Sequence, residues 1–121
     1  MDLINALYDA RMFVKRVEVL SWSFVASHNK NQPVDEREFI NITCMSMETY
    51  DKVVRFMDNT DPILKKILEF ASETECISRY WLTQFDEHAK IDIQAYINTA
   101  KSASQLESEI LTTALRLHKG L

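Results

Sequence analysis

The chain has 121 residues, of which 46% are apolar and 26% are charged, and its formal net charge is −4. These values are average for a folded protein and differ from the low hydrophobicity and high charge of a disordered chain. The basic residues occur singly or in pairs, so they form no basic surface for a nucleic acid. We therefore predict a single acidic domain that covers residues 1–121 and does not bind nucleic acid.

Glycine is nearly absent, since Gly120 is the only one in the sequence. Tight hairpin turns depend on the positive φ angles that glycine adopts, so a multi-stranded antiparallel sheet is disfavoured. The phosphate-binding P-loop, the dinucleotide-binding turn and the nucleophile elbow also require internal glycines. The sequence thus excludes these three kinds of site. We expect no cofactor, and an enzyme is the less favoured class of protein.

The amino terminus carries Asp2 where a secretory signal would carry positive charge. No apolar run reaches the roughly 18 residues that a membrane-spanning helix needs. Two cysteines, Cys44 and Cys76, are too few for a secreted disulfide framework. We expect a cytoplasmic protein with no membrane partner.

The first predicted helix covers residues 2–28 and has apolar residues at three- and four-residue spacing. It ends in a polar loop that contains Pro33. The segment from Phe13 to Ala26 is apolar over more than the one stripe that a core needs. This pattern predicts a helix that is either central in the fold or buried against a partner.

The second predicted helix covers residues 35–58, with Asp35 as its N-cap and Glu38 completing an approximate capping box. Asp58, Asn59 and Thr60 are expected to end it. Its apolar residues form two neighbouring stripes. One consists of Phe39, Ile42, Val53 and Met57, and the other of Ile40, Cys44, Met47 and Val54.

The third predicted helix covers residues 62–87, and the fourth covers residues 92–118. Asp61 is the expected cap of the third, followed by Pro62 at the first helical position. Gly120 is the expected C-cap of the fourth. Ser72 and Ser104 each precede a glutamate by three residues, so either helix could begin there instead.

Four helices with short connections predict an all-α protein, an antiparallel up-down four-helix bundle. The minority alternative is an α+β fold with a small mixed sheet, because three segments alternate between apolar and polar residues: 17–25, 40–44 and 91–95.

Antiparallel helices place residues at calculable heights along the bundle. Cys44 and Cys76 are each 16 residues from Thr60, so they should lie at the same height on adjacent helices. In the cytoplasm we expect both thiols to be reduced and buried.

The first and third helices run in the same direction, so their carboxyl ends should meet at one end of the bundle. Seven aromatic and histidine residues gather there: Trp22, Phe24, His28, Tyr80, Trp81, Phe85 and His88. We call this region the aromatic end. An aromatic core explains it structurally, whereas an interaction surface or ligand pocket is the functional hypothesis. Because His118 should lie at the opposite end, the three histidines cannot share a metal, and we expect no metal site.

The leading functional prediction is a non-enzymatic protein–protein interaction module, a small cytoplasmic helical adaptor, regulator or inhibitor. Its partner would be another protein or itself, in a homodimer formed through the apolar first helix. The alternative is a small-ligand-binding bundle or enzyme with an aromatic pocket at the Trp22/Trp81 end.

Overall fold

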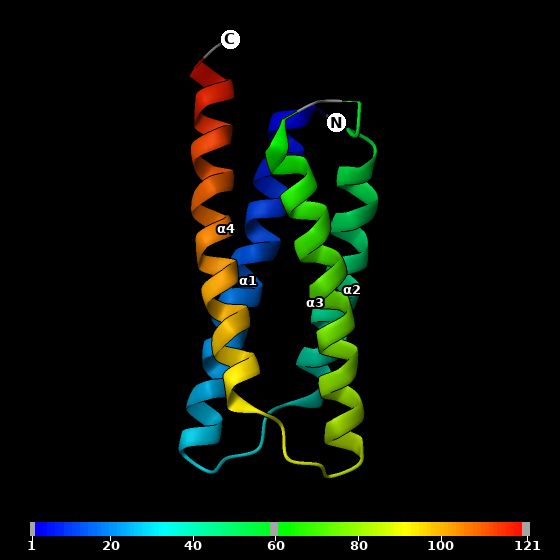
Figure 1. Ribbon diagram of the computed structural model, residues 1–121, viewed down its shortest axis with the longest axis vertical. Helices are drawn as coiled ribbons and strands as arrows, with labels where there is room; N and C mark the ends of the chain where they lie inside the picture. The colour runs from blue at the N-terminus through cyan, green and yellow to red at the C-terminus, as the bar shows by residue number, and fades with distance from the viewer. Residues whose placement is uncertain (1, 59–60, 120–121) are drawn as a thin grey trace.

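The computed structural model describes residues 2–58 and 61–119, and four helices account for most of them (Figure 1). The helices are α1 (Leu3–Asn29), α2 (Glu36–Val54), α3 (Pro62–Asp86) and α4 (Ile93–Lys119). They run alternately up and down, which confirms the all-α antiparallel four-helix bundle. The described residues contain no strand, so the alternative of a mixed sheet was wrong. The roles predicted for Asn59, Thr60 and Gly120 lie outside the described residues.

Two helices begin where the sequence predicts, because an aspartate caps each of them. The Asp35 carboxylate accepts a hydrogen bond from the backbone N–H of Arg37 at 3.0 Å. The Asp61 carboxylate accepts one from the N–H of Ile63 at 3.1 Å, and Pro62 occupies the first turn. Each cap satisfies a backbone donor that the helix itself leaves free.

The second half of the predicted capping box has another partner. Glu38 does not reach back to its own N-cap; its carboxylate accepts a hydrogen bond from the Arg16 guanidinium of α1 at 3.5 Å. The alternative starts at Ser72 and Ser104 were also wrong, since α3 and α4 are continuous through both positions. A sequence match to a capping box therefore marked one true helix start and two positions inside helices.

The predicted end of the second helix at residue 58 was wrong, because α2 ends at Val54. The N–H groups of Phe56 and Met57 donate to the carbonyls of Val53 and Val54, three residues back, at 2.9 and 3.2 Å. These hydrogen bonds span three residues instead of the four of an α-helix, so residues 55–58 form turns and not α-helix.

Both loops at the lower end of Figure 1 begin with a left-handed residue that is not glycine, Asn31 at φ 56° and His88 at φ 53°. After each, the N–H of the following residue donates to a carbonyl five residues back at 2.8 Å. Glycine is usual at this position, but asparagine and histidine enter the left-handed region more readily than most residues do. A chain without internal glycine can therefore still end its helices sharply.

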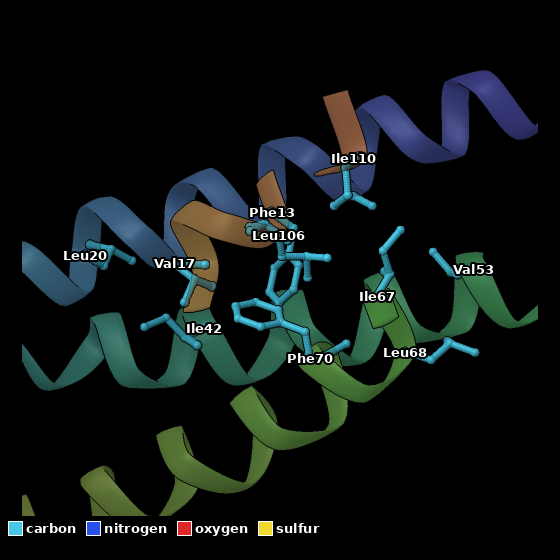
Figure 2. Packing of buried hydrophobic residues seen from close by; sticks show 14 of the residues in the cluster. Phe13, Val17, Leu20, Ile42, Val53, Ile67, Leu68, Phe70, Leu106 and Ile110 are labelled. Atoms are coloured by element: carbon cyan, nitrogen blue, oxygen red, sulfur yellow. The ribbon is translucent and has the colours of Figure 1, made fainter. Parts of the chain in front are cut away.

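The four helices form two close pairs. α1 packs tightly against α4, and α2 against α3, while the two pairs lie less closely together. Figure 1 shows the wider separation between the α1–α4 pair and the α2–α3 pair. Larger side chains fill the space between the pairs. The rings of Phe13 and Phe70 meet edge to face there, with centroids 5.9 Å apart (Figure 2).

Candidate interaction surface

The residues predicted to form the aromatic end divide between core and surface. Phe24 is 2% exposed and Trp81 is fully buried, while Phe85 is partly buried against them. The remaining four side chains are exposed: Trp22, His28, Tyr80 and His88. Trp22 and Phe24 separate in this way because residues two positions apart point about 200° apart around a helix.

The buried part of the aromatic end is a closely packed cluster centred on Trp81. Its ring centroid lies 6.1 Å from that of Phe24, 6.0 Å from Phe39 and 4.7 Å from Tyr96. Phe39 and Tyr96 were not among the residues that the sequence predicted for the aromatic end. The signal for them was present, because α2 and α4 begin at the end of the bundle where α1 and α3 finish.

The chemistry of this cluster is that of a core. Burial raises the pKa of Tyr96 from 10.0 to about 12, because the apolar surroundings disfavour the charged phenolate. The indole N–H of Trp81 is buried and has no hydrogen-bond partner among the described residues. Such a packed, uncharged cluster lends no support to the hypothesis of a ligand pocket at this end.

The histidines lie at helix ends, as the sequence predicted. His28 is in the last turn of α1, His88 directly follows the C-cap of α3, and His118 is in the last turn of α4. All three are exposed. In the described part of the chain, no group of three histidine, cysteine or acidic residues is placed to hold a metal ion.

The prediction of buried cysteines was wrong, since Cys44 and Cys76 are both exposed free thiols. The prediction that the two cysteines lie at the same height on adjacent helices agrees with a contact close to them. The hydroxyl oxygens of Thr43 on α2 and Ser78 on α3 lie 2.6 Å apart. Cys44 belongs to the second apolar stripe of α2, and that stripe faces solvent rather than the core.

The outer face of α1 carries large apolar side chains that the core does not bury. Met12 is 71% exposed, Val19 is 52% exposed and Trp22 is 42% exposed. They belong to a row of residues at alternating spacings of four and three along one side of the helix. We call this row the α1 stripe: Tyr8, Met12, Lys15, Val19, Trp22 and Ala26.

A second exposed row lies on α2. Ile40, Met47, Tyr50 and Val54 are each about two-fifths exposed or more. The Arg79 guanidinium of α3 reaches across to the Met47 sulfur at 3.7 Å. Of the two stripes predicted for α2, the first lies in the core except for Met57, which lies beyond the end of the helix and is 52% exposed, and the second lies on the surface.

A hollow of about 380 Å³ separates α1 from α2. Its lining includes Ala10 and Phe13 from α1 and Met45 and Val53 from α2. Met12 lines the edge of this hollow and also belongs to the α1 stripe, so the two apolar regions are continuous. Charged side chains from both helices complete the lining: Asp9, Arg16, Glu48 and Lys52.

Within the described residues, no helix is both long and apolar enough to cross a membrane. Comparison with family models, with curated proteins and with solved structures yields no match to this chain. The surface of the bundle is therefore the feature that indicates a function.

Proposed function

We propose that the protein is a non-enzymatic protein–protein interaction module and that the α1 stripe is its contact surface. The observation that carries this proposal is the exposure of Met12, Val19 and Trp22 on one side of a single helix. Isolated apolar residues on a surface are ordinary, but several large ones along one side of a helix, here with Lys15 among them, favour a binding site.

The core does not account for these three residues. α1 buries its inner face through a separate set of side chains, among them Val14, Val17 and Phe24. The outer residues therefore contribute little to folding, and their burial becomes favourable only when a partner covers them. Trp22 is the strongest candidate anchor, because tryptophan is enriched among residues that dominate binding energy.

The partner is another protein or a second copy of this chain. The adjoining hollow between α1 and α2 would enlarge the contact, since Met12 belongs to both. In such a role the protein would act as an adaptor, regulator or inhibitor, with specificity set by the charges that border the apolar surface.

The test replaces the exposed valine by a charge. Val19→Glu places a carboxylate in the middle of the stripe, whereas Ser23→Glu introduces the same group at an exposed polar position one turn later. Light scattering over a dilution series measures self-association, and affinity purification from native lysate measures capture of other proteins. We expect Val19→Glu to abolish whichever association the wild-type chain shows and Ser23→Glu to retain it.

Circular dichroism and urea unfolding establish that both variants are folded. If Val19→Glu and the wild-type chain associate equally in both measurements, the α1 stripe is not the contact surface and the proposal is wrong.

A further inference from the structure

We infer that the α1 stripe binds the α1 stripe of a second copy of this chain, with the two helices antiparallel. In this arrangement Met12 lies opposite the partner's Trp22, Lys15 opposite the partner's Val19, and Tyr8 opposite the partner's Ala26. The inference rests on the proposed function and adds to it the identity of the partner and the direction of pairing.

The spacing of the stripe is that of a coiled-coil seam. Successive members are separated by four, three, four, three and four residues, which keeps them along one line of contact between two helices. The seam divides into two alternating sets. Met12, Val19 and Ala26 form the first set, and Tyr8, Lys15 and Trp22 form the second.

Antiparallel pairing about the height of Val17 places every residue of the first set opposite one of the second. The smallest member, Ala26, then faces the large ring of Tyr8. The Met12 sulfur faces the Trp22 indole, a favourable contact between a polarizable sulfur and an aromatic ring. Two-fold symmetry repeats each of these contacts, so one surface supplies both halves of the interface.

Charge complementarity separates the two directions of pairing. Parallel pairing would place Lys15 beside the partner's Lys15, and like charges repel at such distances. Antiparallel pairing places Lys15 beside the partner's Glu18. Within one chain these two groups already attract, since the Lys15 ammonium lies 3.3 Å from the Glu18 carboxylate. A single lysine in an apolar seam is also a recognised determinant of register.

The two arginines that flank the stripe form ion pairs within their own chain. The Arg11 guanidinium is held by the Glu107 carboxylate of α4 at 2.8 Å. The Arg16 guanidinium lies 3.5 Å from the Glu38 carboxylate of α2. Two cationic groups beside the seam are thus paired within their own chain, which limits repulsion between copies.

The length of the stripe sets the expected strength of the dimer. From Tyr8 to Ala26 the helix rises by roughly 27 Å. One pair of helices of this length makes an interface at the small end of the range for specific complexes. We therefore expect a dimer that dissociates on dilution.

The test uses disulfide cross-linking in a chain whose natural thiols have been removed by Cys44→Ser and Cys76→Ser. Tyr8→Cys and Ala26→Cys are introduced singly and together, which leaves Met12, Val19 and Trp22 in place. Mild oxidation at high protein concentration is followed by non-reducing electrophoresis. We expect covalent dimers from the variant with both cysteines and almost none from either single variant.

The distances explain this expectation. In the antiparallel dimer the two copies of residue 26 lie roughly 27 Å apart along the helices, whereas a disulfide requires Cα atoms within about 7 Å. The same separation prevents a bond between positions 8 and 26 of one chain. Efficient cross-linking of either single variant would show parallel pairing and overturn the inference.

The outcome also distinguishes this inference from the proposed function. Parallel cross-links, or a chain that stays monomeric throughout the dilution series, overturn the antiparallel dimer. In either case the interaction module stands if Val19→Glu still removes an association that Ser23→Glu retains, and it falls if Val19→Glu removes none.

Discussion

The two close helix pairs of the bundle, α1 with α4 and α2 with α3, pack through different small side chains. The buried faces of α1 and α4 are rich in alanine: Ala6, Ala10, Ala100, Ala103 and Ala114. Those of α2 and α3 carry small hydroxyl residues instead: Ser46, Thr49, Thr74 and Ser78. Small side chains of either kind allow helix backbones to approach closely.

The hydroxyl pair has hydrogen bonds between small polar groups in the helix contact itself, whereas the directional contact between α1 and α4 is the part-buried ion pair of Arg11 and Glu107 at 2.8 Å. The Ser46 hydroxyl donates to the carbonyl of Ile42 at 2.7 Å, and the hydroxyls of Thr43 and Ser78 join α2 to α3. Methyl groups fit by shape alone and tolerate sliding of one helix along the other, whereas a hydrogen bond between helices sets their relative height. The two pairs therefore differ in what fixes their register, which is an ion pair of long side chains for α1 and α4 and hydroxyl groups within the contact for α2 and α3.

The largest effect is expected when a buried alanine in the pair of α1 and α4 is replaced by a larger residue. Ala103 is fully buried, so Ala103→Leu must displace neighbouring side chains or separate α1 from α4. We expect the free energy of unfolding, measured in urea, to fall by about 3 kcal/mol. Ser104→Leu adds the same side chain at the adjacent exposed position and should change it little. Equal effects of the two substitutions would mean that this pair is not closely packed.

The next effect concerns Tyr96, which lies where the two pairs meet. Its pKa is raised from the ordinary 10.0 to about 12 by burial, so folding favours the neutral phenol. The resulting stability is fully present below pH 10 and is lost as the pH rises toward 12, by about 1.4 kcal/mol for each pH unit. Urea unfolding between about pH 8 and about pH 12, a range that covers this interval, should show a steeper loss in the wild-type chain than in Tyr96→Phe. Parallel pH profiles would contradict this account.

A smaller effect of opposite sign is expected at Ser21, a buried serine of the alanine-rich pair. Its hydroxyl is buried and finds no hydrogen-bond partner in the part of the chain that the structure describes. Ser21→Ala removes that unsatisfied group and should raise the free energy of unfolding by about 1 kcal/mol. Ser46→Ala is the control in the other pair, because its hydroxyl is hydrogen-bonded and its loss should bring no gain. Destabilisation by Ser21→Ala would show that the hydroxyl has a partner in solution.

The smallest expected effect is the coupling energy of the hydroxyl contact between α2 and α3. A double-mutant cycle with Thr43→Val and Ser78→Ala separates their coupling from the cost of each substitution. We expect a coupling of about 0.5 kcal/mol in urea unfolding, the lower range for a hydrogen bond between neutral groups. The same cycle with Thr43→Val and the distant Thr112→Val should give none. A zero coupling for Thr43 and Ser78 would mean that their contact does not fix the register of α2 against α3.

Much of this fold could be predicted because its signals are local. Asp35 and Asp61 cap helices through hydrogen bonds to residues two positions away, and Pro62 suits a first turn wherever the helix packs. The end of α2 at Val54 was harder to predict from the sequence, because no glycine or proline marks it. The hydrogen bonds that end it span only one residue fewer than those of an α-helix.

Prediction of the candidate site was weaker, because exposure depends on which neighbours cover each face. α1 is apolar on both sides between Phe13 and Ala26, so periodicity alone could not show which side faces the core. Packing against α2 and α4 buries Phe24 and leaves Trp22 on the surface. For α2, both stripes were visible in the sequence, and only the tertiary structure turned Phe39 inward and Cys44 outward.

The number of helices, their starts and their antiparallel order follow from short-range hydrogen bonds, chain length and the scarcity of glycine, all of which can be read along the chain. The division into two close pairs, the burial of Trp81 and the exposure of the α1 stripe arise from contacts between residues distant in sequence. Those contacts depend on the combined volume and shape of all four helices, a property that no segment carries alone.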